Sequence, residues 1–177
     1  RFVNEYGLSK AVAAELTTTR ETGDYFEQAI TSQPNVSAKR IANLIQRELT
    51  AALNRDGLNI GNSRVAPETI GELAAKIEDN TVSSSAANIV FDDLWHAGDS
   101  GNVDSVIEQR GLKQITDISA IETIVDEVIA GNPDQVEQFR RGKEKVIGFL
   151  VGQIMKTSQG KANPQQVNEL LRKKLRD

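Results

Sequence analysis

The chain has 177 residues, enough for one large or two small domains, and its content of 38% hydrophobic and 26% charged residues is typical of a folded globular protein. It contains no cysteine, which excludes disulfides and thiolate metal sites, and one histidine, which excludes a metal site built from several histidines. The formal net charge is −4, which by itself assigns no partner.

The first third of the chain has the apolar spacing of helices. Ser9 is the predicted N-cap of the first helix, and an Asp-Gly pair at 56–57 is the predicted end of the third. A polar connection covers 57–66. The spacing predicts helices over about 9–16, 21–30 and 37–55, with Tyr25 and Phe26 facing inward.

The next helices begin at clear start signals. Pro67 begins one that runs to about Asp79, and Ser83 or Ser84 begins another that runs to about Ala97. A loop at 98–102 and a short helix over about 103–110 follow, and Gly111 ends that helix. We place a domain boundary here, which predicts a helical domain over 1–111 and a C-terminal tail domain over 112–177.

The tail domain reads as a small helical bundle. Ser119 and Glu122 fit a capping box, and the helix that they start ends near Ala130. A helix follows over about 133–141. An apolar helix over about 144–156, in which Phe149 widens the apolar band, then leads through a polar turn at 157–162 to a last helix.

Three features of these last helices carry further expectations. Asn163 and Pro164 form a typical helix start. Gly148 and Gly152 lie four residues apart, and we expect another backbone to approach them closely, which would compensate for their low helix propensity. The apolar run of about 11 residues is far shorter than the roughly 20 that span a bilayer, so we expect no membrane helix.

The chain is all-α by these patterns, and its charge is divided unevenly. Residues 140–177 hold ten Lys and Arg against three Asp and Glu, whereas residues 1–139 hold eleven against twenty-two. An acidic body with a basic tail is suited to a polyanionic partner, although a solvated charged end would give the same pattern.

Complete catalytic signatures are absent from the sequence. There is neither a dinucleotide-binding fingerprint nor a P-loop. The adjacent acids at 78–79, 92–93 and 126–127 do not face each other on a helix, so we interpret them as solvated surface. Trp95 with His96 is interpreted as a core Trp beside a partly exposed His. We therefore expect no catalytic residue and no metal site here.

The cations of the tail are the candidate binding residues. They can neutralise phosphates, and since aromatic residues are scarce around them, structured RNA read through its backbone fits better than a stacked single strand. A membrane surface is the weaker alternative. The predicted site residues are Arg140, Arg141, Lys143, Lys156, Lys161, Asn163, Lys173 and Lys174.

Several motifs resemble one family. In the tail they are Val125-Asp-Glu-Val128, Asn132-Pro133, Gly142-Lys143, Leu150-Val-Gly-Gln-Ile-Met-Lys156, Gly160-Lys-Ala-Asn-Pro164 and Val167-Asn168. Weaker matches precede them, at Glu5-Tyr-Gly-Leu-Ser9, Tyr25-Phe-Glu27 and Pro67-Glu68 followed by Leu73. Together they are similar to the C-terminal helical and tail domains of the B subunit of aspartyl/glutamyl-tRNA amidotransferases, the GatB/YqeY family.

This resemblance implies a role in protein biosynthesis. The family's complete protein is part of a ligase of the cytoplasm that uses ATP and Mg²⁺ to convert the glutamate or aspartate on a misacylated tRNA into the amide. Ammonia comes from the ligase's glutaminase or A subunit, and the C subunit joins the other two. The catalytic cradle of the family has no counterpart here, so the resemblance implies a tRNA-holding piece of a longer protein, without a cofactor of its own. The first residue, Arg1, agrees with such a piece.

The implied partners are tRNA(Gln) or tRNA(Asn) and the A and C subunits of the amidotransferase, and we expect this piece alone to be a monomer that does not bind membranes. Gln159 departs from the family, in which a basic residue is common at this position. The alternative is a free-standing YqeY-like module that binds a protein and no nucleic acid.

Overall fold

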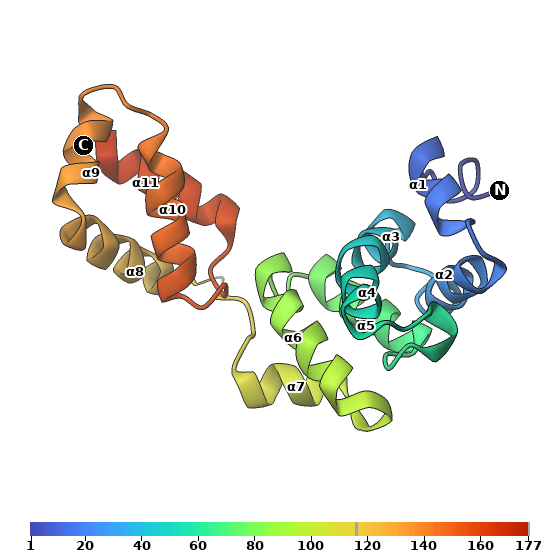
Figure 1. Ribbon diagram of the computed structural model, residues 1–177. Coiled ribbons are helices and arrows are strands. Elements are labelled where there is room, and N and C mark those ends of the chain that lie inside the picture. Colours follow the sequence, from blue (N-terminus) through green and yellow to red (C-terminus); the bar gives the residue numbers. More distant parts are fainter. Residues whose placement is uncertain (116, 177) are drawn as a thin grey trace. The chain divides into compact units, whose positions relative to one another are not determined.

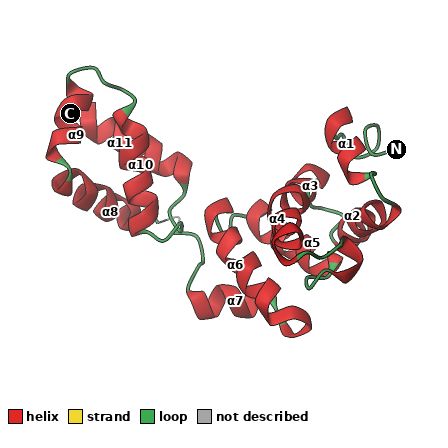
Figure 2. Ribbon diagram, viewed as in Figure 1, coloured by secondary structure: helices red, strands yellow, loops and turns green. Residues whose placement is uncertain are grey.

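The structure is a computed structural model that describes residues 1–115 and 117–176 (Figure 1). Helices and loops make up the described chain, together with one isolated parallel bridge between Ile115 and Ala162 (Figure 2). This confirms the all-α class.

The chain forms two compact units, each described here by itself. Unit 1 contains residues 1–81 and 87–111, and unit 2 contains residues 82–86 and the chain from Leu112 onward. Residues 82–86 thus belong with a part of the chain that begins 26 positions after Ala86, at Leu112. As domains, 1–111 and 112–177 stay a prediction.

Unit 1 is built from short helices whose ends carry the expected local signals. Ser9 Oγ accepts a hydrogen bond of 3.2 Å from the Val12 N–H, and Gly57 and Gly111 end their helices in the left-handed region. The elements are α1 (Lys10–Leu16), α2 (Arg20–Ser32), α3 (Ala38–Leu44), π-helix η1 (Ile45–Leu49), α4 (Thr50–Asp56), 3₁₀-helix η2 (Ile60–Asn62), α5 (Pro67–Glu78), α6 (Ser84–Ala97), 3₁₀-helix η3 (Gly98–Ser100) and α7 (Val103–Arg110). The first three residues of α6, 84–86, belong to unit 2.

The core of unit 1 lies where α2 packs against α5. Tyr25 and Phe26 are buried as predicted. Gly71 of α5 crosses α2 so closely that a Cβ on it would lie 2.6 Å from Ser32 Oγ and 2.9 Å from the Ala29 carbonyl oxygen. A close backbone approach is therefore found at Gly71, where the sequence pattern did not indicate it.

The predicted helix over 37–55 is continuous but contains an unpredicted π-helical segment, η1. The Thr50 hydroxyl donates a hydrogen bond of 2.8 Å to the Ile45 carbonyl oxygen, five residues back. The widened turn still keeps Ile45 and Leu49 buried, so the predicted apolar face is preserved across it.

Unit 2 contains four α-helices in its described residues (Figure 1). Their apolar faces surround one core, of which Ile121, Leu150, Ile154, Val167 and Leu171 are fully buried. The helices are α8 (Ile118–Gly131), α9 (Pro133–Arg140), α10 (Val146–Thr157) and α11 (Pro164–Arg176).

The start of α8 differs from the prediction. The helix begins at Ile118, and Asp117 is its N-cap, with the carboxylate accepting a 2.9 Å hydrogen bond from the Ser119 N–H. The predicted capping box of Ser119 and Glu122 is wrong, because Ser119 already lies within the first turn. The ammonium of Lys174 binds Glu122 instead.

The exposed side of α10 also corrects two expectations. No described atom of another segment lies within 4 Å of a Cβ built on Gly148 or on Gly152, so no described backbone approaches them closely. Phe149 is 47% exposed and does not widen the buried band. Only the opposite side of α10, with Ile147, Leu150 and Ile154, faces the core.

Candidate nucleic-acid interface

The predicted cations occupy three places in unit 2. Arg140 ends α9, and Arg141 and Lys143 lie in the connection to α10. Lys156 lies in the last turn of α10 and Lys161 in the turn after it. Lys173 and Lys174 are in the last turn of α11.

Three of the eight predicted residues are held by contacts inside unit 2. The Arg141 guanidinium pairs with the carboxylate of Glu137, one turn earlier in the chain. The Lys174 ammonium lies 2.6 Å from Asp126 and 2.9 Å from Glu122. Hydrogen bonds from Lys174 to Asp126 and then to Glu122 raise its pKa above the ordinary value.

Asn163 is held by its role as a helix cap. Its side-chain oxygen accepts hydrogen bonds from the N–H groups of Gln165 at 2.9 Å and Gln166 at 3.3 Å, which confirms the predicted start of α11. The oxygen is therefore occupied at the helix terminus, and Asn163 positions the chain between Lys161 and α11.

The other five predicted residues make no ion pair with a residue that the structure describes. Four of them are exposed and Lys161 is partly exposed. Such cations can bind an anion without first breaking an ion pair with a carboxylate. They are Arg140, Lys143, Lys156, Lys161 and Lys173.

The turn that carries Lys161 is held firmly by buried polar contacts. Ser158 is 5% exposed, and its hydroxyl accepts a 3.3 Å hydrogen bond from the Ala162 N–H. The Lys161 carbonyl oxygen accepts a 2.6 Å hydrogen bond from the Ile115 N–H. Because its backbone is fixed in this way, the Lys161 side chain projects from a constant position. The sequence pattern of this turn indicates only that it is polar and gives no signal of these contacts.

Gln159 and Gly160 turn the chain here with positive φ angles of 55° and 74°. Gln159 is exposed, and as an uncharged residue it adds no cation between Lys156 and Lys161. The Gly160 carbonyl oxygen accepts a hydrogen bond from the buried Ser83 hydroxyl. Ser83 was considered only as a possible helix start, because no local signal connects it to residue 160.

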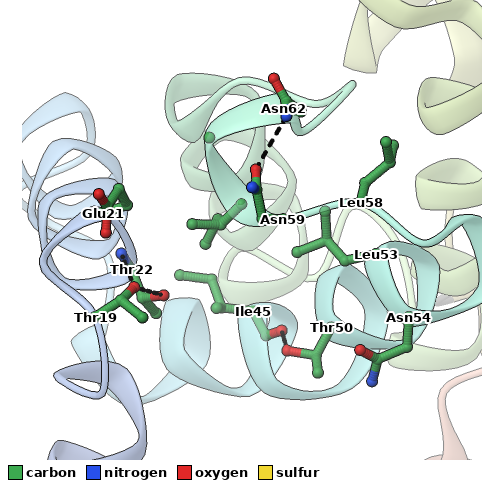
Figure 3. Close-up of a pocket in the computed structure, with 12 residues that line it drawn as sticks. Thr19, Glu21, Thr22, Ile45, Thr50, Leu53, Asn54, Leu58, Asn59 and Asn62 are labelled. Atoms are coloured by element: carbon green, nitrogen blue, oxygen red, sulfur yellow. Dashed lines mark hydrogen bonds between the residues drawn. The ribbon is translucent and has the colours of Figure 1, made fainter.

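A hollow in unit 1 is unsuited to phosphate (Figure 3). It has a volume of about 620 Å³, and its lining contains threonine, asparagine and aliphatic side chains with one carboxylate, from Glu21, and no Lys, Arg or His. In Figure 3, Asn62 donates a 3.1 Å hydrogen bond to Asn59, and Thr19 and Thr22 share one of 2.9 Å, so these polar groups bind each other.

Trp95 and His96 lie as their interpretation from the sequence predicts, with the Trp in the core and the His at the surface. Trp95 is fully buried, and its indole N–H donates a 2.8 Å hydrogen bond to Asp56. This bond, with a second from Arg55, holds the pKa of Asp56 below its ordinary value. His96 is exposed, and its ring meets only Asp92 of its own helix.

Neither a metal centre nor a membrane span is found in the part of the chain that the structure describes. No three His, Asp or Glu side chains among residues 1–115 and 117–176 are arranged to hold a metal ion. No helix within these ranges is long and apolar enough to cross a bilayer.

The chain is thus an all-α protein region whose second unit exposes cations that make no ion pair with a described residue. The model of one family, the GatB domain, matches residues 24–175, and the chain belongs to this family. This confirms the resemblance seen in the motifs.

Curated relatives carry the name of the B subunit of aspartyl/glutamyl-tRNA(Asn/Gln) amidotransferase. The protein of Halorhodospira halophila is 58% identical over 175 residues, which are 99% of this chain and 36% of the relative. The proteins of Alkalilimnicola ehrlichii and Coxiella burnetii are 51% and 49% identical over the same shares. The chain therefore spans about a third of the length of these relatives.

Proposed function

We propose that unit 2 holds a tRNA for an amidotransferase, with the five unpaired cations binding phosphates of the RNA backbone. The observation that carries this proposal is their lack of carboxylate partners among the described residues, whereas Arg141 and Lys174 are held in ion pairs inside the unit. Relatives that act in the amidation of aminoacyl-tRNA, by their name, support tRNA as the polyanion.

Structured RNA suits this surface better than an extended single strand. Binding of single strands relies on several aromatic side chains on which successive bases stack. Phe149 is the one large aromatic residue among the exposed hydrophobic residues of the described chain, so no row of aromatic rings is available. Recognition through phosphates and RNA shape needs no such row.

The chemistry of the complete amidotransferase is proposed to take place outside this chain. The described residues contain no cluster of three His, Asp or Glu side chains that could hold a metal ion. We infer that ATP and Mg²⁺ bind elsewhere in the complete protein, that the A and C subunits of the amidotransferase are its partners, and that it works in the cytoplasm. This chain would contribute tRNA positioning and no catalytic group.

A charge-neutralised variant tests the proposal. Lys143, Lys156 and Lys161 are replaced together by Gln, and binding of unmodified tRNA(Gln) and tRNA(Asn) transcripts is measured at fixed salt by fluorescence anisotropy. We expect binding to weaken by an order of magnitude or more, because each lost phosphate contact removes a counterion-release contribution.

The matched control removes the same charge from unit 1. Lys10, Lys39 and Arg47 are exposed or partly exposed and make no ion pair with a described residue, and they are replaced by Gln in a second triple variant. Its binding should stay close to that of the parent chain. Equal losses in the two variants would mean that net charge matters and that unit 2 has no binding surface of its own.

A further inference from the structure

One side of α10 is open along its whole length. Lys145 precedes the helix with helical backbone angles (φ −60°, ψ −22°), and Lys156 lies in its last turn. Phe149 and Gly152 lie between the two lysines on the same side of the helix, with Gly148 beside them. Lys145, Phe149, Gly152 and Lys156 follow one another at steps of four, three and four residues, which is the spacing of one helix face. All five are exposed, and we call them the open face of α10.

The folding of unit 2 does not explain these residue types. Phe149 keeps 47% of its surface in water, whereas Leu150 and Ile154 on the opposite side are fully buried. Each glycine weakens the helix relative to alanine, and the open space around both would accommodate a methyl group. Packing among the described residues therefore does not explain why the Phe149 ring lies beside Gly148 and Gly152 on this side of α10.

The charge of the open face identifies the kind of molecule that fits it. Lys145 and Lys156 make no ion pair with a described residue, and none of the five residues is acidic. Lys156 follows Lys145 by eleven positions, so their backbones lie about 16 Å apart along the helix axis. Two ammonium groups at this distance can bind separate phosphates of one nucleic-acid strand.

We propose that the open face of α10 binds a loop of a structured RNA, with backbone phosphates on Lys145 and Lys156 and an unstacked base on the ring of Phe149. An aromatic ring binds the face of any base, and loops are where RNA presents bases that are free to stack. Gly148 and Gly152 lack side chains that would hold the RNA away from the helix. The proposal rests on tRNA binding by unit 2 and assigns the contact to one helix face.

The test measures RNA affinity and folding stability on the same variants of the 177-residue chain. Binding of a labelled, unmodified tRNA(Gln) transcript is followed by fluorescence anisotropy, and the midpoint of thermal unfolding by circular dichroism. Phe149→Ala, Phe149→Trp and Gly152→Ala probe the open face. Ile118→Ala, at an exposed apolar residue of α8, and Gly131→Ala, at an open glycine of α8, are the matched controls.

The expected results separate binding from stability. Phe149→Ala weakens binding about fivefold or more, and Phe149→Trp restores it, because a Trp ring also stacks on a base. Gly152→Ala raises the unfolding midpoint by about 2–4 °C and yet weakens binding. The two α8 controls stay within about twofold of the parent affinity, which is near the size of an ordinary surface effect.

Three outcomes would overturn the proposal. If the parent binds tRNA with a strong dependence on salt, and Phe149→Ala and Gly152→Ala bind tRNA as tightly as the parent, the open face of α10 is not the RNA contact. The proposed tRNA holding by unit 2 would stand, and the open face would be the docking site of a protein. If Phe149→Trp binds as poorly as Phe149→Ala, no base stacks on the ring. If the parent does not bind tRNA at all, the proposed function fails together with this inference.

Discussion

The Ser83 hydroxyl donates a hydrogen bond to the carbonyl oxygen of Gly160, 77 residues later in the chain. The same hydroxyl accepts a 3.0 Å hydrogen bond from the Ala86 N–H, in the first turn of α6. Ser83 therefore caps a helix and at the same time fixes the turn that presents Lys161. One buried side chain thus ties residues 82–86 to the part of unit 2 that carries the proposed cations.

Replacing Ser83 by Ala should destabilise unit 2. The change leaves the Gly160 carbonyl oxygen and the Ala86 N–H buried without this partner, and such a loss costs about 1–3 kcal/mol. Urea unfolding followed by circular dichroism measures it. Ser85→Ala, at an exposed neighbour, should change the unfolding free energy by no more than about 0.5 kcal/mol. Equal stability of the Ser83 variant and the parent would show that the bond contributes nothing.

Gly160→Ala should cost more than Gly142→Ala. Both glycines have positive φ angles, of 74° and 95°, which strain an alanine by about 1–2 kcal/mol. Only at Gly160 would the new Cβ also lie 3.3 Å from Ser85 Cβ and 3.4 Å from the Ala86 nitrogen. The difference between the two unfolding free energies isolates this crowding. Identical losses would mean that the backbone conformation alone requires glycine at residue 160.

Gly71→Ala is expected to destabilise unit 1 by about 1–3 kcal/mol, because the Ala29 carbonyl oxygen of α2 would have to move away from the new methyl group. Thermal unfolding provides the measurement. Gly152→Ala, at an open helical glycine, should shift the midpoint in the opposite direction. A stabilising effect at both positions would contradict the close packing of α2 on α5.

Alkaline pH should weaken folding through Tyr25. Its hydroxyl donates a 2.6 Å hydrogen bond to the Val65 carbonyl oxygen, and burial raises its pKa well above the ordinary value. Above about pH 10 the unfolded chain releases the phenol proton while the folded chain keeps it, so stability falls by up to about 1.4 kcal/mol per pH unit. Urea unfolding between about pH 9 and 11 should show a shallower fall for Tyr25→Phe. Parallel curves would exclude this contribution.

Local chemistry made much of the fold predictable from the sequence. Ser9, Gly57, Gly111 and the Asn163-Pro164 pair mark helix ends through hydrogen bonds or backbone angles within a few residues of themselves. Apolar spacing likewise placed the buried sides of the helices, as for Ile41 and Leu49. Such signals need no knowledge of the tertiary structure.

Features that depend on distant parts of the chain were not predictable. The approach at Gly71 depends on how α5 crosses α2, and the site of Lys174 depends on carboxylates 48 and more residues earlier. The prediction that Phe149 widens the apolar band is wrong because helical spacing alone cannot show how wide the covered side of α10 is. The candidate site therefore kept five of its eight predicted residues and gained the open face of α10, while Arg141, Lys174 and Asn163 are held by contacts inside unit 2.

The salt dependence of tRNA binding tests the central claim most directly. Affinities of the 177-residue chain for tRNA(Gln), tRNA(Asn) and an unstructured RNA of equal length are measured from low to moderate salt. Five cations on phosphates predict a slope of about −3.5 to −4.5 in log K against log salt, together with a preference for tRNA. Absence of binding at low salt, or equal affinity for the unstructured RNA, would contradict tRNA holding by this chain.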